Sequence, residues 1–158
     1  MKGGNGSAML EIEGGIRVDA LMVVDPVTVQ AIAGARTRNG SRVAGDVGLL
    51  RGLAPVEVPA GENTTVGVVI TNARLDKEQL AVVARRAHDG LARAVRPAHT
   101  PSDGDTTFAL ATGEITGDVS LLRIGILAAD TTAIVRGVRA ATSLPGYPSA
   151  QDLQGGVR

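Results

Sequence analysis

Residues 61–73 read Gly-Glu-Asn-Thr-Thr-Val-Gly-Val-Val-Ile-Thr-Asn-Ala, a polar turn signal followed by two threonines and an apolar run. The run at 66–70 is rich in β-branched residues and is bounded by turn residues, a pattern typical of a buried strand. The sequence therefore predicts a strand here, with the hydroxyl of Thr64 at its mouth.

Two interpretations of Thr64 follow from this position. If the peptide bond after Asn63 is cut, the new α-amine has an ordinary pKa of about 7.7 to 8 and lies beside its own hydroxyl. The amine can then take the hydroxyl proton near neutral pH, so that one residue is both base and nucleophile. The alternative is ordinary strand chemistry, because β-branched side chains suit a pleated sheet and asparagine is a common turn residue.

Composition excludes several classes of function. The 158 residues fit one domain, and an apolar content of 44% can fill a core. Sixteen basic and sixteen acidic residues cancel, and Phe108 and Tyr147 are the only aromatic residues, which argues against nucleic-acid or membrane partners. The absence of cysteine removes disulfides and thiolate chemistry. No signal peptide or membrane-spanning run is recognisable, so a cytoplasmic protein is expected.

The first part of the chain predicts a hairpin followed by a long irregular segment. Strands over 8–12 and 16–24 are expected to pair around a glycine turn. The second strand ends at Asp25, a candidate site carboxylate, although Asp before Pro is also a common start of a turn. Residues 35–59, interrupted by glycines and arginines, are interpreted as a mobile surface segment that presents a processing site.

The later part of the chain predicts a helix, a strand, a second helix and a tail. The first helix begins at Asp76, which has a glutamine three residues on, the spacing of a capping box. A strand is expected over 107–112, and a largely buried helix, capped by Asp118, over 119–141. Residues 143–158 are expected to form an uncovered tail.

Residues 99–106 read His-Thr-Pro-Ser-Asp-Gly-Asp-Thr, and they place Asp103 and Asp105 just before the strand predicted over 107–112. Three interpretations are open: a turn built on Asp-Gly, a sparsely ligated metal site that includes His99, or a pair of carboxylates that orients an amine or hydroxyl from another strand. His88, near the edge of the helix's apolar stripe, is interpreted as a packed or capping residue and not as a ligand.

Three stretches together, 63–73, 87–93 and 99–106, resemble the aminopeptidase/D-esterase family of self-cleaving N-terminal nucleophile hydrolases. Within that family they are most similar to the threonine branch that contains nylon-oligomer hydrolase, and the resemblance runs from about residue 2 to about residue 115. It implies an α+β fold, a four-layer αββα sandwich of the type shared with ornithine acetyltransferase. The sandwich is assembled from two fragments of one precursor and is usually part of a homo-oligomer.

By position, the resemblance implies that Thr64 is the nucleophile freed by autocleavage after Asn63, and that Asp103 and Asp105 are the acidic pair that assists it. It implies hydrolysis of amide bonds in small peptides or amide oligomers through an acyl-enzyme, with no metal or cofactor. Residues 1–63 would belong to the α fragment and 64–142 to the β fragment of a single domain.

Two departures from the family pattern stand out. Asp25 lies where the family usually has an asparagine that donates a hydrogen bond to the oxyanion, and an ionised aspartate cannot donate. A protonated Asp25, with a raised pKa, could donate. Family members also have a long segment upstream of Lys2, including a lysine of the active site, so the sandwich is expected to be incomplete at its N-terminus.

The predicted function is therefore a self-processing N-terminal-threonine amidohydrolase or aminopeptidase. The alternative is a truncated, non-catalytic remnant of that family. A weaker alternative is an acyltransferase, because the sequence does not distinguish water from an amine as the acceptor of the acyl group.

Overall fold

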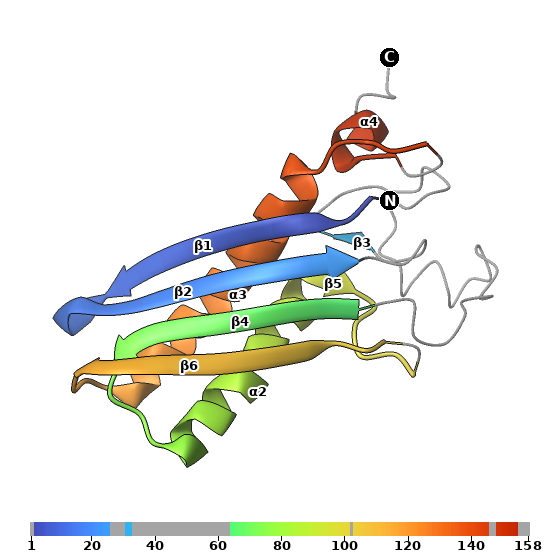
Figure 1. Cartoon of the computed structure of the whole chain (residues 1–158). Coiled ribbons are helices and arrows are strands. Elements are labelled where there is room, and N and C mark those ends of the chain that lie inside the picture. The colour runs from blue at the N-terminus through green and yellow to red at the C-terminus, as the bar shows by residue number, and fades with distance from the viewer. Residues whose placement is uncertain (1, 26–30, 33–63, 102, 146–147, 155–158) are drawn as a thin grey trace.

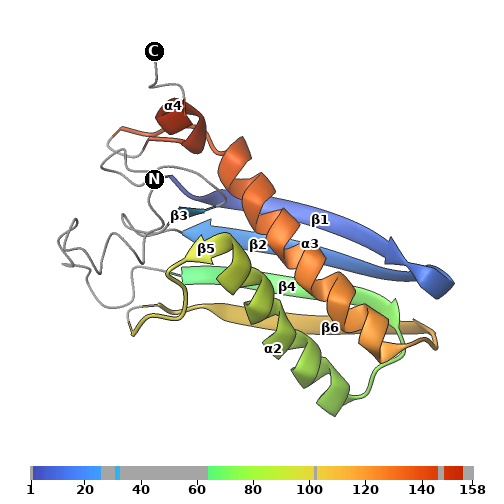
Figure 2. The same ribbon diagram turned by 180° about the vertical axis from the view of Figure 1, so that it is seen from behind.

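The computed structural model describes residues 2–25, 31–32, 64–101, 103–145 and 148–154 (Figure 1). One four-stranded sheet carries two long helices on the same face, as Figures 1 and 2 show from opposite sides. Along the sheet the strands are β1 (Gly4–Ile12), β2 (Ile16–Asp25), β4 (Thr64–Ala73) and β6 (Thr106–Ile115). The covering helices are α2 (Lys77–Ala94) and α3 (Val119–Ala140).

The predicted hairpin is confirmed, and it extends further than the sequence indicated. β1 and β2 pair antiparallel from Gly4 opposite Val24 to Ile12 opposite Ile16. The short 3-10 turn η1 (Glu13–Gly15) joins them. Its two glycines have φ angles of 82° and 76°, which glycine adopts without the steric cost that a side chain would add.

β4 lies in the middle of the sheet, antiparallel to β2 and parallel to β6. A parallel connection needs a crossover, and α2 supplies it between β4 and β6. The predicted capping box of α2 is present: Gln79 N donates to Asp76 Oδ1 at 2.7 Å, and Asp76 N donates to Gln79 Oε1 at 2.9 Å. After α2 the two-residue strand β5 (Val95–Arg96) pairs with β3 (Ala31–Ile32).

The core lies between the helices and the face of the sheet that they cover, which we call the inner face. Five of its strand residues, each at most 3% exposed, are Val18, Ala20, Met22, Val24 and Val69. The helices add Val83, Leu91, Leu122, Ile126 and Ile134, each at most 1% exposed. At Gly137 the backbone of α3 approaches β1 closely, because a Cβ there would lie 2.8 Å from Gly6 N.

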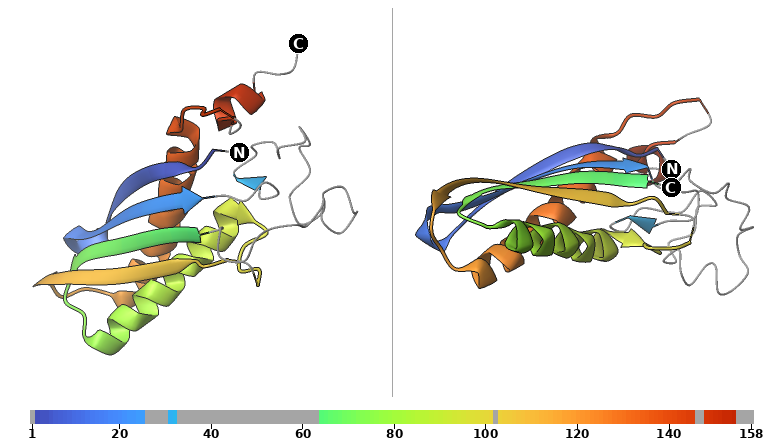
Figure 3. Two further views of the ribbon diagram at one scale, coloured as in Figure 1. Left: turned by 45° about the vertical axis from the view of Figure 1, so that its right-hand side comes forward. Right: turned by 60° about the horizontal axis from the view of Figure 1, so that its bottom comes forward.

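The opposite side of the same sheet, which we call the outer face, is apolar and exposed. Its large hydrophobic residues are 36–64% exposed: Met9, Leu21, Val23, Val66, Ile70, Phe108 and Leu110. The right-hand view of Figure 3 shows that α2 and α3 both lie on the other side of the sheet. The described residues thus form an α+β pair of layers, the four-stranded sheet and its helix layer, with β3 and β5 as a separate two-stranded sheet. They contain no second large sheet packed on the outer face, as the expected four-layer sandwich has.

The prediction of an uncovered tail after residue 143 is wrong for part of that segment. Ser149 and Ala150 are 3% and 2% exposed, and Lys2 N donates to Pro148 O at 2.8 Å. The short helix α4 (Ala150–Gln154) begins there, with Asp152 N donating to Ser149 Oγ at 3.3 Å. The spacing Ser149-x-x-Asp152 is a helix-start signal. The prediction for residues 35–59 lies outside the described residues.

Candidate active site

The ends of three strands meet at one edge of the sheet. In the antiparallel pair of β2 and β4, Asp25 lies opposite Thr64. In the parallel pair of β4 and β6, Val66 lies opposite Thr106. The register therefore brings two of the predicted site residues, Asp25 and Thr64, next to each other, and it places the loop that carries Asp103 and Asp105 beside them.

Thr64 is the first residue of β4, as predicted, and is half-buried. Side chains alternate along a strand. Thr65 is 4% exposed and belongs to the inner face, whereas Val66 is 43% exposed and belongs to the outer face. By this alternation Thr64 shares the outer face with Val66. Asn63, the residue on the other side of the predicted cleavage point, lies outside the described residues.

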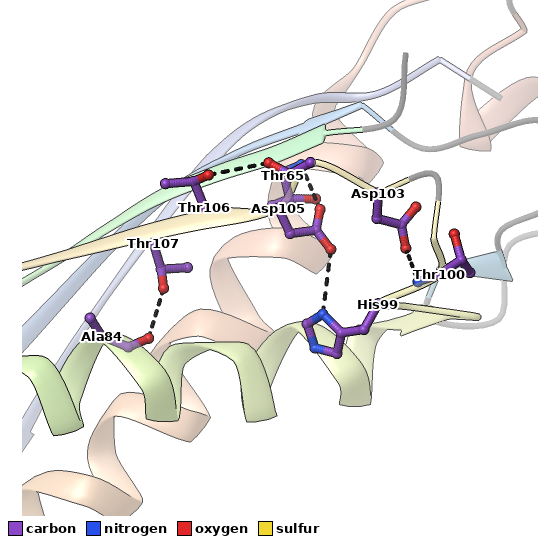
Figure 4. Close-up of polar contacts among 9 residues, drawn as sticks. Thr65, Ala84, His99, Thr100, Asp103, Asp105, Thr106 and Thr107 are labelled. Carbon is purple, nitrogen blue, oxygen red and sulfur yellow. Dashed lines mark hydrogen bonds and ion pairs between the residues drawn. The ribbon is translucent and has the colours of Figure 1, made fainter. Parts of the chain in front are cut away.

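Asp105 fastens the first peptide of β4 to the loop before β6 (Figure 4). Its Oδ1 accepts a hydrogen bond of 2.8 Å from Thr65 N, one peptide beyond the predicted nucleophile. Its Oδ2 lies 3.7 Å from His99 Nδ1, and the side chain is only 9% exposed. The carboxylate thus orients the backbone of a neighbouring strand. The sequence suggested that the acidic pair orients an amine or hydroxyl from another strand; here the oriented group is a backbone amide.

Burial raises the pKa of Asp105 above its ordinary value, and the nearby charge of Asp103 acts in the same direction. The hydrogen bond from Thr65 N opposes this rise, as do the charges of His99 and His88. Burial disfavours the charged form of a carboxyl group, while a donor or a cation beside it favours that form. The protonation of Asp105 therefore depends on a balance between burial and named neighbours.

Asp103 has a different role from Asp105 in this structure. Its Oδ2 accepts a hydrogen bond of 2.6 Å from Thr100 N, and its own N–H donates to Thr100 O at 3.0 Å. These contacts close a local turn between Thr100 and Asp103, which ends where the Asp-Gly step that the sequence suggested as the turn begins. Among the residues that the structure describes, no three His, Cys, Asp or Glu side chains gather closely enough to hold a metal ion.

Two histidines beside Asp105 form a pair that the sequence did not predict. His99 has a φ of 59°, in the left-handed region that few residues other than glycine adopt. Its ring lies 5.1 Å from the ring of His88 on α2, between ring centres. Burial lowers the pKa of His88, and the charge of His99 lowers it further. The interpretation of His88 as a packed residue agrees with this contact, and the pairing was missed because it joins two separate elements.

A further contact holds the helix to the strand that follows the acidic loop. Thr107 Oγ1 donates to Ala84 O of α2 at 2.7 Å (Figure 4). Because Thr107 is two residues after Asp105, this bond fixes the start of β6 against α2.

No described helix combines the length and the apolar character that crossing a membrane requires.

Comparison with known proteins gives a consistent result. A family model described as peptidase family S58 matches residues 1–151. An uncharacterized aminopeptidase of Mycobacterium tuberculosis is 34% identical over 180 residues, which cover 97% of this chain and 52% of that protein. A 6-aminohexanoate-oligomer endohydrolase of Agromyces sp. is 32% identical over 127 residues, which cover 71% of this chain and 34% of that protein. The chain thus spans about half or less of the length of these relatives.

A solved structure shows the same fold. The L-aminopeptidase D-Ala-esterase/amidase of Ochrobactrum anthropi, described as a variant of the Ntn hydrolase fold, superposes with a TM-score of 0.57. It is 22% identical in sequence, and the match covers 85% of this chain and 39% of that one. The α+β layers described above are therefore part of an Ntn-hydrolase fold, as the resemblance implied.

Proposed function

Because this chain belongs to peptidase family S58, we propose that it is a self-processing amidohydrolase whose nucleophile is Thr64, freed by cleavage after Asn63. The observation that carries the proposal is the hydrogen bond that Thr65 N donates to Asp105 Oδ1. It holds the start of β4 in place, with Thr64 at the first strand position and opposite Asp25. A hydroxyl fixed at a strand mouth, on a residue that cleavage would make N-terminal, has the layout that nucleophilic catalysis needs.

In this proposal the freed α-amine of Thr64 takes the proton of its own hydroxyl, and Oγ1 attacks the carbonyl carbon of an amide. The proton then passes from the α-ammonium to the leaving amine as the carbon–nitrogen bond breaks, and an acyl-enzyme ester remains. Water, deprotonated by the same amine, then attacks the ester carbon. The bond from that carbon to Oγ1 breaks, the ammonium returns its proton to Oγ1, and the acid is released. Asp105 acts in these steps by orienting the backbone next to the nucleophile, since its oxygens contact Thr65 and not the hydroxyl.

The proposed substrates are small peptides or amide oligomers. The relatives named as an aminopeptidase and as a 6-aminohexanoate-oligomer endohydrolase support this class, because both names describe cleavage of amide bonds. We also propose that cleavage divides one precursor into two fragments, one that ends at Asn63 and one that begins at Thr64. The two fragments would stay together in a homo-oligomer, as the resemblance implied. An acyltransferase would use the same acyl-enzyme with an amine in place of water.

The proposal is tested by comparing three variants of the full chain for self-cleavage and for hydrolysis of small amides. Thr64→Ala is expected to abolish both reactions, and Thr64→Ser to retain both at a reduced rate, because serine keeps the hydroxyl. Thr106→Ala, at the mouth of the neighbouring strand, is the matched control and is expected to retain both. Cleavage or hydrolysis by Thr64→Ala would refute the nucleophile assignment.

A second candidate function is that of a non-catalytic remnant that folds fully only with a partner. The observation that favours it is the exposed outer face, onto which Thr64 opens. Large exposed apolar patches on a soluble protein usually mark an interaction site or an aggregation hazard. In that case the wild-type chain would stay uncleaved, and adding amide substrates would release no product.

A further inference from the structure

Asp105 uses its two carboxylate oxygens for two different neighbours. Oδ1 accepts from Thr65 N at 2.8 Å, which is a hydrogen bond, whereas Oδ2 lies 3.7 Å from His99 Nδ1, which is too long for one. At that distance a protonated imidazole and a carboxylate still attract each other; the carboxylate is 9% exposed and the imidazole 45% exposed, so solvent screens the attraction in part. Each carboxylate oxygen therefore has its own neighbour, Oδ1 the Thr65 amide and Oδ2 the His99 ring.

The position of the His99 ring is itself held by two features. Its backbone φ of 59° is unfavourable for a residue with a β-carbon, and such a conformation persists only where the surroundings hold it. Its ring leans on His88 of α2, with the two ring planes tilted by 52°. Figure 4 shows the His99 ring between the helix and Asp105. A strained residue aimed at a site carboxylate is a reason to look for a role in that site.

We propose that His99 is a positioning residue: its imidazole holds the Asp105 carboxylate against the Thr65 amide and thereby fixes the backbone beside Thr64. This inference deepens the proposed function and rests on it for its catalytic meaning. The charged and titratable groups that face Asp105 are His99 and Asp103 from its own loop and His88 from α2. Of the two histidines, His99 has the larger effect on the carboxylate.

The alternative is that His99 only fills space beside α2. Replacing it by a residue that tolerates the same backbone conformation would then leave the titration of Asp105 and the exchange of the Thr65 amide unchanged. Glycine adopts a φ near 59° without strain, and asparagine is among the other residues that do so most readily. His99→Gly therefore removes the ring without adding backbone strain. His99→Asn is a second variant that keeps a polar side chain without the ring or its charge.

The test follows two signals by NMR in the full chain: exchange of the Thr65 amide proton and titration of the Asp105 carboxyl carbon. In His99→Gly and His99→Asn we expect the Thr65 amide to exchange about tenfold faster, since a weakened hydrogen bond to a charged acceptor changes an opening equilibrium by about that factor. We also expect the pKa of Asp105 to rise, because the charge that favours its ionised form is gone. The control is His88→Gln, for which both changes should be smaller.

These measurements do not depend on catalysis, so they separate the inference from the proposed function. Faster exchange at Thr65 with a raised Asp105 pKa supports the positioning role even if the chain never cleaves itself. An unchanged Thr65 amide and an unchanged Asp105 titration in both variants would overturn it. If the chain does cleave itself, the pH profile of cleavage in His99→Asn should shift in the same direction as the Asp105 titration, and an unshifted profile would contradict the role.

Discussion

The two faces of the sheet come from the same four strands and have opposite surroundings. On β2, Met22 is fully buried under the helices, whereas the adjacent Leu21 is 47% exposed. Both faces are apolar, so hydrophobic content alone does not tell which face is covered. The difference teaches that this chain stabilises its fold through the inner face, while Thr64, the proposed nucleophile, opens on the outer face.

The largest contrast is expected from matched truncations on the two faces. Met22→Ala should lower the free energy of unfolding by about 2–5 kcal/mol, because it leaves a cavity under the helices. Leu21→Ala, one residue earlier on the outer face, should change it by about 0.5 kcal/mol or less. Urea unfolding of both variants measures the difference. Equal losses would show that something covers the outer face in solution.

The core on the inner face is not wholly apolar, because it also contains a buried carboxylic acid, Asp130 of α3. Both carboxylate oxygens lack a hydrogen-bond partner among the described residues, and a Cβ on Gly90 would lie 2.6 Å from the Asp130 Cβ. Burial raises the pKa of Asp130 from 3.8 to about 7. The folded protein therefore keeps this proton at pH values where the unfolded chain has released it.

It follows that stability falls as the pH rises from about 4 to about 7, because in this window the unfolded state binds fewer protons than the folded state. We expect the loss to be on the order of 2–4 kcal/mol, and Asp130→Asn to remove most of this slope. The exposed Asp89→Asn is the control and should keep the slope. Urea unfolding across the pH range measures it, and a stability that rises over this window in the wild type would refute the assignment.

At the end of β2, Asp25 provides a test of how complete the proposed catalytic site is. Asn can donate a hydrogen bond to an oxyanion, whereas an ionised Asp cannot. If the site is otherwise competent, Asp25→Asn should raise the rate of amide hydrolysis by up to about 100-fold, the usual effect of one oxyanion donor. Steady-state assays on a small amide measure it. A lower rate would show that the reaction needs the carboxyl group of Asp25, which an amide cannot replace.

A smaller loss than that of Met22→Ala is expected at the start of α2. Asp76→Ala removes the side-chain half of the capping box, the bond of 2.7 Å that Gln79 N donates to Asp76 Oδ1. The expected loss is about 1 kcal/mol of unfolding free energy, measured by urea titration. Glu78→Ala in the same turn is the control. A loss as large as that of Met22→Ala would mean that the helix end, and not the inner face, limits stability.

Local signals in the sequence predicted most of the elements. The glycine turn, the β-branched run after Thr64 and the Asp76 cap each act on neighbouring residues, so a short pattern suffices to recognise them. The start of α4 has a local signal of the same kind, the pair Ser149 and Asp152, which lies within the segment predicted to be a tail. The two long helices and the strand before the second helix were found by their apolar patterns.

Features that depend on distant pairing were not predictable in this way. The register that places Asp25 opposite Thr64, and the choice of which apolar face the helices cover, depend on contacts between residues far apart in the sequence. The same applies to Asp105, which the resemblance grouped with Asp103, whereas the structure gives one the Thr65 amide and the other a local turn. The His88–His99 pair joins α2 to a loop, and no periodic pattern marks such a contact.

The central claim is that Thr64 becomes an N-terminal nucleophile at the mouth of β4. Its most direct test is the intact mass of the purified wild-type chain under denaturing conditions, together with sequencing of any new N-terminus. We expect two fragments, one ending at Asn63 and one beginning at Thr64. A single unbroken mass after prolonged incubation near neutral pH would contradict the claim for this chain and would favour the non-catalytic remnant.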